Sequence, residues 1–270
     1  MIKKYLIYSL LIIVAVGMAF PIVWMLILSL KTNPETLDNT SKLLFSDYNL
    51  NNYKEAITSD SFDKYLFNSL FVSIIVTIGN IFFCTITGYV LARKKFRGNK
   101  LILISIIGVM MIPPHVIMIP LYRTMVNFDW INSYQALIIP WLITPFGVFL
   151  VKQYLSNIPE AIEQAAIIDG ASQLQLLFKI IFPLAKPIII VLAVYVFLMN
   201  WNSFLFPFLF TNNSDYWTLP VGLTFYLGKQ SIDWGHLMSG ASMSAIPIIV
   251  LFMIFQKQII KGLTAGAIKE

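Results

Sequence analysis

The sequence predicts an all-α membrane protein with six transmembrane helices and both termini in the cytoplasm. Of its 270 residues, 58% are hydrophobic and only 12% are charged, and the mean hydropathy is +0.77. A soluble domain has about 25% charged residues, so this chain has too few to cover a surface exposed to water. The composition excludes a soluble enzyme, a disordered chain and a nucleic-acid binder, although the net charge is +6. The single cysteine, Cys84, excludes a disulfide framework and is interpreted as a packing residue.

The positions of the spans follow from the six longest runs without Asp, Glu, Lys or Arg, each of at least 22 residues. A helix needs about 20 apolar residues to cross about 30 Å of hydrocarbon. A charge at the middle of a span costs about 2.5–3.5 kcal/mol. Trimmed at their ends, the runs predict one transmembrane domain, residues 1–270, with spans at 5–30, 65–92, 101–122, 133–152, 187–210 and 236–256.

The distribution of basic residues predicts the orientation, because cytoplasmic loops carry an excess of Lys and Arg. If the N-terminus is cytoplasmic, 13 of the 19 Lys and Arg residues fall in inner segments and six in outer segments. The basic cluster from Arg93 to Lys100 is interpreted as part of this topology signal rather than as a binding site.

The chain shows no means of driving transport by itself. Apart from Lys152, the last residue of the fourth, no charged residue lies in a predicted span, whereas proton and ion relays are built from such residues. The nearest approach to a phosphate-binding loop, residues 222–230, has the wrong glycine spacing and has Gln230 where Ser or Thr is needed. The sequence also shows no metal-ligand cluster and no catalytic triad. We therefore expect no catalytic residue, cofactor or metal in this chain, and energy from a partner.

The cytoplasmic loop 156–183 has the form of a docking element. Asn157 is placed to cap a helix, and Gly170 is placed to end it in a left-handed conformation. Small residues on this helix would let another protein approach closely: Ala161, Ala165 and Ala166. A second short helix is predicted to present one apolar face with the spacing i, i+3, i+4, i+7: Leu174, Leu177, Phe178 and Ile181. The residues alone leave open a simple interfacial linker.

The same loop resembles the EAA loop of ABC-importer permeases. That pattern is Glu-Ala-Ala, three residues, Gly, nine residues and Ile-x-Leu-Pro, and it is matched by Gln164-Ala165-Ala166, Gly170, Ile180 and Pro183. Two positions depart from it, because Gln164 replaces Glu and Phe182 replaces Leu. Asp169-Gly170-Ala171 has the form common in the sugar-importer branch.

Further motifs resemble the MalG-type subunits of carbohydrate importers, in the same order over about 250 residues. They are Phe20-Pro21, Trp24-Met25, Ser29-Leu30-Lys31, Asn68-Ser69-Leu70, Gly88-Tyr89-Val90-Leu91-Ala92-Arg93, Phe96-Arg97-Gly98, Met111-Ile112-Pro113, Ile119-Pro120-Leu121-Tyr122, Trp201-Asn202-Ser203-Phe204, Gln256 and 262–269. Ser203 replaces the Asp of the branch's Trp-Asn-Asp-Phe pattern.

The resemblance implies the type I ABC importer fold and a multi-pass location in the bacterial inner membrane. It also implies a second, MalF-like permease subunit, two ABC ATPase subunits that hold ATP and Mg, an extracellular solute-binding protein and a carbohydrate substrate. Transport would proceed by alternating access. The residues expected to couple to the ATPases are Glu163, Gln164, Ala165, Ala166, Asp169, Gly170 and Ala171.

Hydrogen-bonding residues in the fifth span are candidates for the substrate path: Asn200, Trp201, Asn202 and Ser203. Their amides suit sugar hydroxyls, and an aromatic face suits the C–H face of a sugar. The alternative is hydrogen bonding to the partner permease. Three other functions stay open at this point: an ABC permease for a non-sugar solute, an ion-coupled secondary carrier, and a membrane assembly protein that transports nothing.

Overall fold

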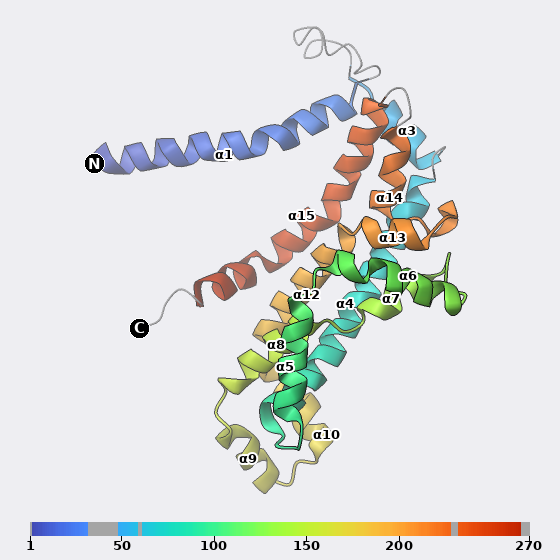
Figure 1. Ribbon diagram of the computed structural model, residues 1–270. Helices are drawn as coiled ribbons and strands as arrows, with labels where there is room; N and C mark the ends of the chain where they lie inside the picture. The colour runs from blue at the N-terminus through green and yellow to red at the C-terminus, as the bar shows by residue number, and fades with distance from the viewer. Residues whose placement is uncertain (1, 32–47, 59–60, 228–231, 266–270) are drawn as a thin grey trace. The chain divides into compact units, whose positions relative to one another are not determined.

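The computed structural model describes residues 2–31, 48–58, 61–227 and 232–265, and within these ranges the chain is helical, with no strand. This confirms the predicted all-α class. The chain divides into two compact units, residues 1–67 with 218–249 and residues 68–217 with 250–270. The boundaries fall inside two long helices, α4 (Phe62–Arg93) and α15 (Trp234–Ala265), which Figure 1 shows in cyan to teal and in red.

The first unit is formed by two separate stretches of the chain, residues 1–67 and 218–249. Besides the beginnings of α4 and α15, its elements are α1 (Ile2–Ser29), α3 (Asn51–Thr58), α14 (Leu219–Leu223) and the 3₁₀ turn η5 (Thr224–Leu227). The end of α1 is fixed by the Asn52 amide, which donates to the carbonyls of Ser29 and Lys31 at 2.9 and 2.8 Å. Gly240 permits close packing, because a Cβ there would lie 2.9 Å from the Phe62 ring.

The second unit carries the functional loop. Besides the rest of α4 and α15, its elements are α5 (Asn99–Met110), η1 (Pro114–Ile117), α6 (Met118–Asn127), α7 (Tyr134–Ile138), η2 (Ile139–Trp141), α8 (Pro145–Ser156), α9 (Ala161–Ile168), α10 (Gln173–Gln175), the π-helix η3 (Leu176–Ile181), α11 (Phe182–Leu184), α12 (Lys186–Trp201), α13 (Leu205–Phe210) and η4 (Ser214–Tyr216). Helix α8 contacts both α5 and α12, and α9 and α10 lie at the same end of the unit as the loop joining α4 to α5 (Figure 1).

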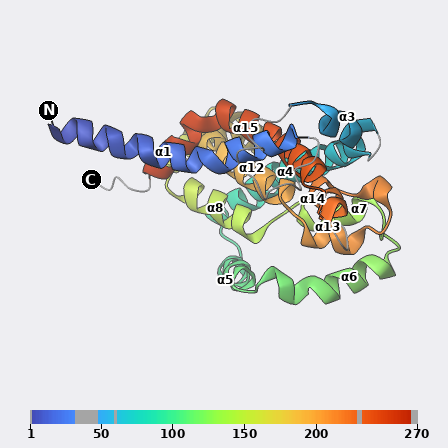
Figure 2. The same cartoon turned by 90° about the horizontal axis from the view of Figure 1, so that it is seen from above.

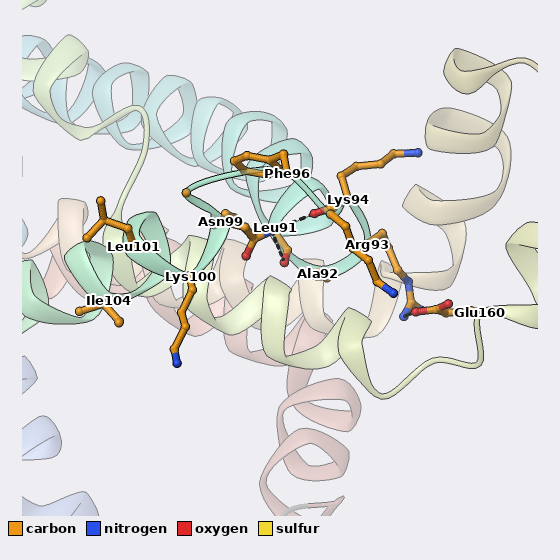
Figure 3. Close-up of a pocket in the computed structure, with 12 residues that line it drawn as sticks. Leu91, Ala92, Arg93, Lys94, Phe96, Asn99, Lys100, Leu101, Ile104 and Glu160 are labelled. Carbon is orange, nitrogen blue, oxygen red and sulfur yellow. Dashed lines mark hydrogen bonds and ion pairs between the residues drawn. The ribbon is translucent and has the colours of Figure 1, made fainter.

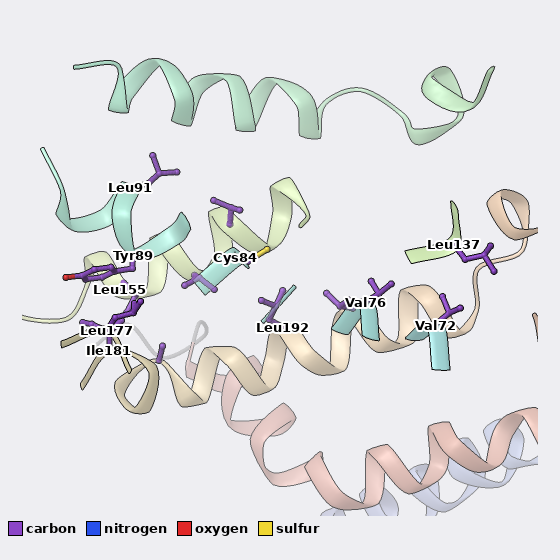
Figure 4. Close-up of a cluster of buried hydrophobic side chains, with 14 of the residues drawn as sticks. Val72, Val76, Cys84, Tyr89, Leu91, Leu137, Leu155, Leu177, Ile181 and Leu192 are labelled. Atoms are coloured by element: carbon purple, nitrogen blue, oxygen red, sulfur yellow. The ribbon is translucent and has the colours of Figure 1, made fainter. Parts of the chain in front are cut away.

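The core of this unit is apolar and closely packed. Figure 4 shows Val76 of α4 and Leu192 of α12 facing one another inside it. Cys84 is fully buried in the same cluster, as the prediction of a packing residue expects. Gly147 lets α8 approach, because a Cβ there would lie 2.8 Å from the Cys84 sulfur and 3.0 Å from Leu192. Close packing of this kind needs small residues where helix backbones meet.

Polar groups satisfy an irregular stretch between η2 and α8. The Asn80 amide of α4 donates to the carbonyl of Trp141. Its oxygen accepts from the Thr144 hydroxyl at 2.7 Å. At membrane depth a backbone carbonyl outside a helix needs such an internal partner, because lipid offers none. Asn80 therefore lets the fourth predicted span break its helix without exposing polar backbone to lipid.

Four helices are long and apolar enough to cross a membrane: 4–29, 62–93, 134–156 and 234–257. Two bent pairs also qualify if each is taken as one span, which gives up to six. The first joins α5 to the segment 114–127 at 94°, and Figure 2 shows α5 end-on while α6 lies in the plane of view. The second joins residues 173–184 to α12 at 74°. The first bend lies inside the third predicted span, whereas the second lies just before residue 187, where the fifth predicted span begins.

Both the third and the fifth predicted spans contain a break in the helix. In the third predicted span, Pro113 and Pro114 follow the end of α5, where a helix cannot continue unbroken. In the fifth, α12 has 16 residues, which rise about 24 Å, and the chain leaves the helix at Asn202 before α13 begins. Residues 266–269 of the C-terminal motif and residues 228–230 lie outside the described ranges.

Candidate coupling site

The loop after α8 folds into a short helix with a defined end. Helix α9 begins at Ala161 and ends at Ile168, after which Gly170 adopts a φ of +86°. The Gly170 amide donates to the Ile167 carbonyl at 3.0 Å, and the Ala171 amide donates to the Ala166 carbonyl at 2.9 Å. This pair of bonds is the Schellman motif, in which a left-handed glycine reverses the chain. The predicted helix stop at Gly170 is therefore confirmed.

The inner face of α9 is held to the end of α4 by a buried ion pair. Arg93 Nε lies 2.6 Å from Glu163 Oε1, and the two side chains are only 6% and 11% exposed. The Tyr89 hydroxyl donates to the other carboxylate oxygen at 3.2 Å. Arg93 Nη2 donates to the Ile158 carbonyl at 2.6 Å. Charge-assisted bonds in a buried place fix orientation, because breaking one partner strands the other charge.

A second contact holds the far side of the same loop. Lys94 Nζ donates to Gln173 Oε1 at 2.9 Å. Ser172 and Gln175 form a reciprocal capping box that begins α10, with bonds of 2.9 and 3.3 Å. Arg93 and Lys94, which are adjacent in sequence, thus bind the two helices that flank Gly170. The loop is thereby attached on both sides to the C-terminal end of α4.

The second short helix differs from its predicted face. Residues 176–181 form a π-helix, whose i→i+5 bonds rotate the following side chains away from α-helical spacing. Leu176, Leu177 and Ile181 are buried, whereas the predicted face members Leu174 and Phe178 are 69% and 47% exposed. The apolar face therefore starts two residues later than the α-helical pattern indicates.

The outer face of α9, defined by Ala161, Gln164, Ala165 and Ile168, is exposed. These positions lie on one side of the helix, because residues three and four apart share a face. The Ile168 side chain is 85% exposed, although isoleucine is among the residues most often buried. A small, partly apolar exposed face on a fixed helix is suited to contact another protein.

The structure places the seven predicted coupling residues on two sides of the loop. Glu163 and Ala166 point inward and are buried, and Ala171 is half-buried. The outward-facing residues are Gln164, Ala165, Asp169 and Gly170. Arg93 and Tyr89 support the loop but were not predicted to do so, because 70 or more residues separate them from Glu163. The only sequence signal was a cation at the last turn of a span.

The substrate-path candidates lie where α12 ends. Trp201 is 2% exposed and stacks on Phe197 at a centroid distance of 5.7 Å. The amide nitrogens of Asn200 and Asn202 donate to carbonyls one turn earlier, at 2.9 and 2.8 Å. Asn202 is exposed, whereas Asn200 and Ser203 are half-buried. Asn202 is therefore the member of this group that is best placed to meet a solute.

Among the residues that the structure describes, no group of three His, Cys, Asp or Glu side chains is placed to hold a metal ion. His236 lies 2.6 Å from Asp233 and 3.2 Å from Glu55, so it takes part in hydrogen bonding within the first unit.

Comparison with known proteins identifies the family to which this chain belongs. Residues 84–265 match the family described as "Binding-protein-dependent transport system inner membrane component". The chain is 34% identical to the trehalose/maltose transport system permease protein MalG of Thermococcus litoralis, over 96% of this chain and 94% of that protein. It is 33% identical to the arabinooligosaccharides transport system permease protein AraQ of Bacillus subtilis, over 93% and 90%.

A solved structure shares the fold. It is a chain of a bacterial ABC transporter involved in the import of the acidic polysaccharide alginate. The TM-score is 0.84 with 21% sequence identity, and the match covers 95% of this chain and 96% of that chain. At this identity the likeness establishes the fold alone.

Proposed function

We propose that this chain, which belongs to the family of inner membrane components of binding-protein-dependent transport systems, is one of two permease subunits that together form the path of a sugar importer. The chain is a multi-pass membrane protein and a transporter subunit, and in this family ATP hydrolysis is carried by separate ATPase subunits. The prediction of an ABC permease rather than an enzyme is thereby confirmed.

The proposed cargo is a sugar or oligosaccharide, delivered by an extracellular solute-binding protein. Two relatives that cover more than nine tenths of the chain are named for trehalose or maltose and for arabinooligosaccharides, which supports this cargo. Within the chain, the exposed Asn202 amide at the end of α12 offers a donor and an acceptor of the kind that sugar hydroxyls require. We place Asn200–Ser203 beside the translocation path on this ground.

The proposed topology has six spans with both termini in the cytoplasm of a bacterial cell, in the inner membrane. The four long apolar helices supply the first, second, fourth and sixth spans, and the two bent helix pairs supply the third and fifth if each crosses once. The excess of Lys and Arg on one set of loops supports the orientation. In this orientation the coupling loop and the basic cluster both lie in the cytoplasm, where an ATPase can reach them.

The proposed coupling runs from the ATPase through α9 to α4. The ATPase subunits, which hold ATP and Mg, would bind the outer face of α9, while the inner face stays paired with Arg93 through Glu163. The single observation that carries this proposal is the buried pair between Arg93 and Glu163, because it fixes α9 to a span while leaving Ala165 and Ile168 exposed. ATPase closure would then move the span, and the two permeases would alternate between inward-open and outward-open states.

A bulky side chain on the outer face tests this coupling. In the full importer, reconstituted in liposomes with its binding protein, Ala165→Trp should reduce ATP-driven sugar uptake at least tenfold and weaken copurification of the ATPase. Ser156→Trp is the matched control, because Ser156 is also exposed but precedes α9. Normal uptake by Ala165→Trp at normal expression would refute the docking assignment. Uptake of an amino acid in place of a sugar would refute the cargo alone.

A further inference from the structure

The loop joining α4 to α5 lines a pocket that includes Lys95 and Lys100, which have no part in the coupling role. Its volume is about 710 Å³, and it lies within the second unit between the end of α4 and the first turns of α5. The positive side chains Arg93, Lys94, Lys95 and Lys100 line it, against one carboxylate, that of Glu160. Figure 3 shows Glu160 at one end of the pocket and the apolar Leu101 and Ile104 at the other.

The pocket retains net positive charge. Glu163, which lies outside the pocket, neutralises Arg93. The nearest charged atoms of Glu160 and Arg93 are 4.0 Å apart. In the part of the chain that the structure describes, neither Lys95 nor Lys100 pairs with a carboxylate. Lys94 is held by the neutral Gln173 amide, so its charge is positioned without being cancelled. An anion entering the pocket therefore meets one positioned cation, Lys94, and two uncompensated ones, Lys95 and Lys100.

The start of α5 adds to this attraction. Helix α5 has 12 residues, and its N-cap Gly98 provides no side-chain cap. The first amides of an uncapped helix carry partial positive charge, and such helix starts bind phosphate groups. Here the helix start is one of several features that point to the same ligand, because the four cations and the pocket stand beside it.

The remaining wall of the pocket has a different chemistry. Leu101 and Ile104 are 68% and 55% exposed, and they continue into α5, which has no buried residue along its length. An anionic site that opens along an apolar helix at the end of a membrane span matches a phospholipid, whose phosphate and acyl chains are joined.

We propose that this pocket binds an anionic phospholipid of the cytoplasmic leaflet, with the phosphate among Lys95, Lys100 and the start of α5 and the acyl chains along Leu101 and Ile104. Anionic lipids are enriched on that side, and basic pockets between spans on the cytoplasmic side bind anionic head groups. From the sequence alone, the basic cluster from Arg93 to Lys100 is interpreted as a topology signal. The pocket gives the same residues a second role. This site rests on the proposed orientation but not on the proposed cargo or coupling.

The test measures lipid retained by the purified importer in detergent by native mass spectrometry. Phosphatidylglycerol should bind in preference to phosphatidylcholine with the same acyl chains. Each basic residue near the surface contributes about 1 kcal/mol, which is about fivefold in affinity. Lys100→Gln should therefore weaken phosphatidylglycerol binding about fivefold, and Lys95→Gln with Lys100→Gln about thirtyfold.

The matched control is Arg97→Gln, which removes one cation from the same loop but outside the pocket. It should change binding less than twofold. An equal loss in Arg97→Gln and Lys100→Gln would overturn the site, because it would indicate a diffuse surface field. If inorganic phosphate displaced phosphatidylglycerol at millimolar concentration and bound the pocket as tightly as the lipid does, the lipid assignment would be overturned in favour of a soluble anion. Because the readout is lipid mass, failure here would leave sugar uptake and its coupling untouched.

Discussion

The buried pair between Arg93 and Glu163 makes a quantitative prediction about the stability of the coupling helix. The perturbation is removal of one charge by Arg93→Gln or Glu163→Gln, each close in size to the original residue. Both side chains are nearly buried, at 6% and 11% exposure. Each substitution therefore leaves an opposite charge in a place with little water. The double substitution removes both charges and leaves neither stranded.

The magnitude follows from the geometry. Removing one partner of a buried pair costs about 3–5 kcal/mol. We expect about 3 kcal/mol here, because a stranded Glu163 keeps the Tyr89 hydroxyl and a stranded Arg93 keeps the Ile158 carbonyl. The double variant should cost much less than the roughly 6 kcal/mol sum of the single changes. The expected interaction energy is on the order of 3 kcal/mol, near the upper end for neighbouring residues.

The assay is hydrogen exchange of the α9 backbone in the intact importer. A loss of about 3 kcal/mol in local opening free energy speeds exchange in residues 161–168 more than a hundredfold, since 1.4 kcal/mol is tenfold. Lys95→Gln is the control, because Lys95 lies two residues after Arg93 and is exposed. Single and double effects that add within about 0.5 kcal/mol would refute the argument, as would unchanged exchange in α9.

Three further substitutions have defined outcomes. Asn68→Ala should lower importer thermal stability by about 2–4 kcal/mol, because the Asn68 amide donates to two loop carbonyls at 2.8 and 2.9 Å and would leave both unpaired; an unchanged melting temperature would contradict this. Gly147→Ala should lower stability by about 1–3 kcal/mol through overpacking against Cys84, whereas Gly17→Ala, in open space, should not lower it. Asn202→Ala should reduce sugar uptake while assembly with the ATPase stays normal, and full uptake would remove Asn202 from the path.

The sequence predicted the positions of the helices better than it predicted the angles between them. A charge-free run indicates that a segment is apolar, and the segments at 4–29, 62–93, 134–156 and 234–257 agree with four predicted spans. The bend of 94° after α5 could not be read from hydropathy, because it depends on Pro113 and Pro114 and on what the turned segment packs against. Proline shows that a helix stops, but packing sets the angle at which the chain resumes.

The candidate site shows the same division between local and distant information. The helix stop at Gly170 is a local backbone requirement, and the left-handed φ confirms it. The side of α9 that faces inward depends on Arg93, a residue 70 positions earlier, so no pattern within the loop could indicate it. The π-helix at 176–181 rotated the second apolar face for a similar reason, since its register is set by tertiary packing.

The most direct test of the account is a crosslink from the outer face of α9 to the ATPase. Gln164→Cys places a thiol on that face, whereas Asn212→Cys places one on an exposed loop predicted to lie on the opposite side of the membrane. In inside-out vesicles that contain the whole importer, the Gln164→Cys thiol should crosslink to an ATPase subunit, with a yield that changes when ATP binds, and the Asn212→Cys thiol should not. Crosslinking only from position 212, or solute movement by this chain without any ATPase, would contradict the account.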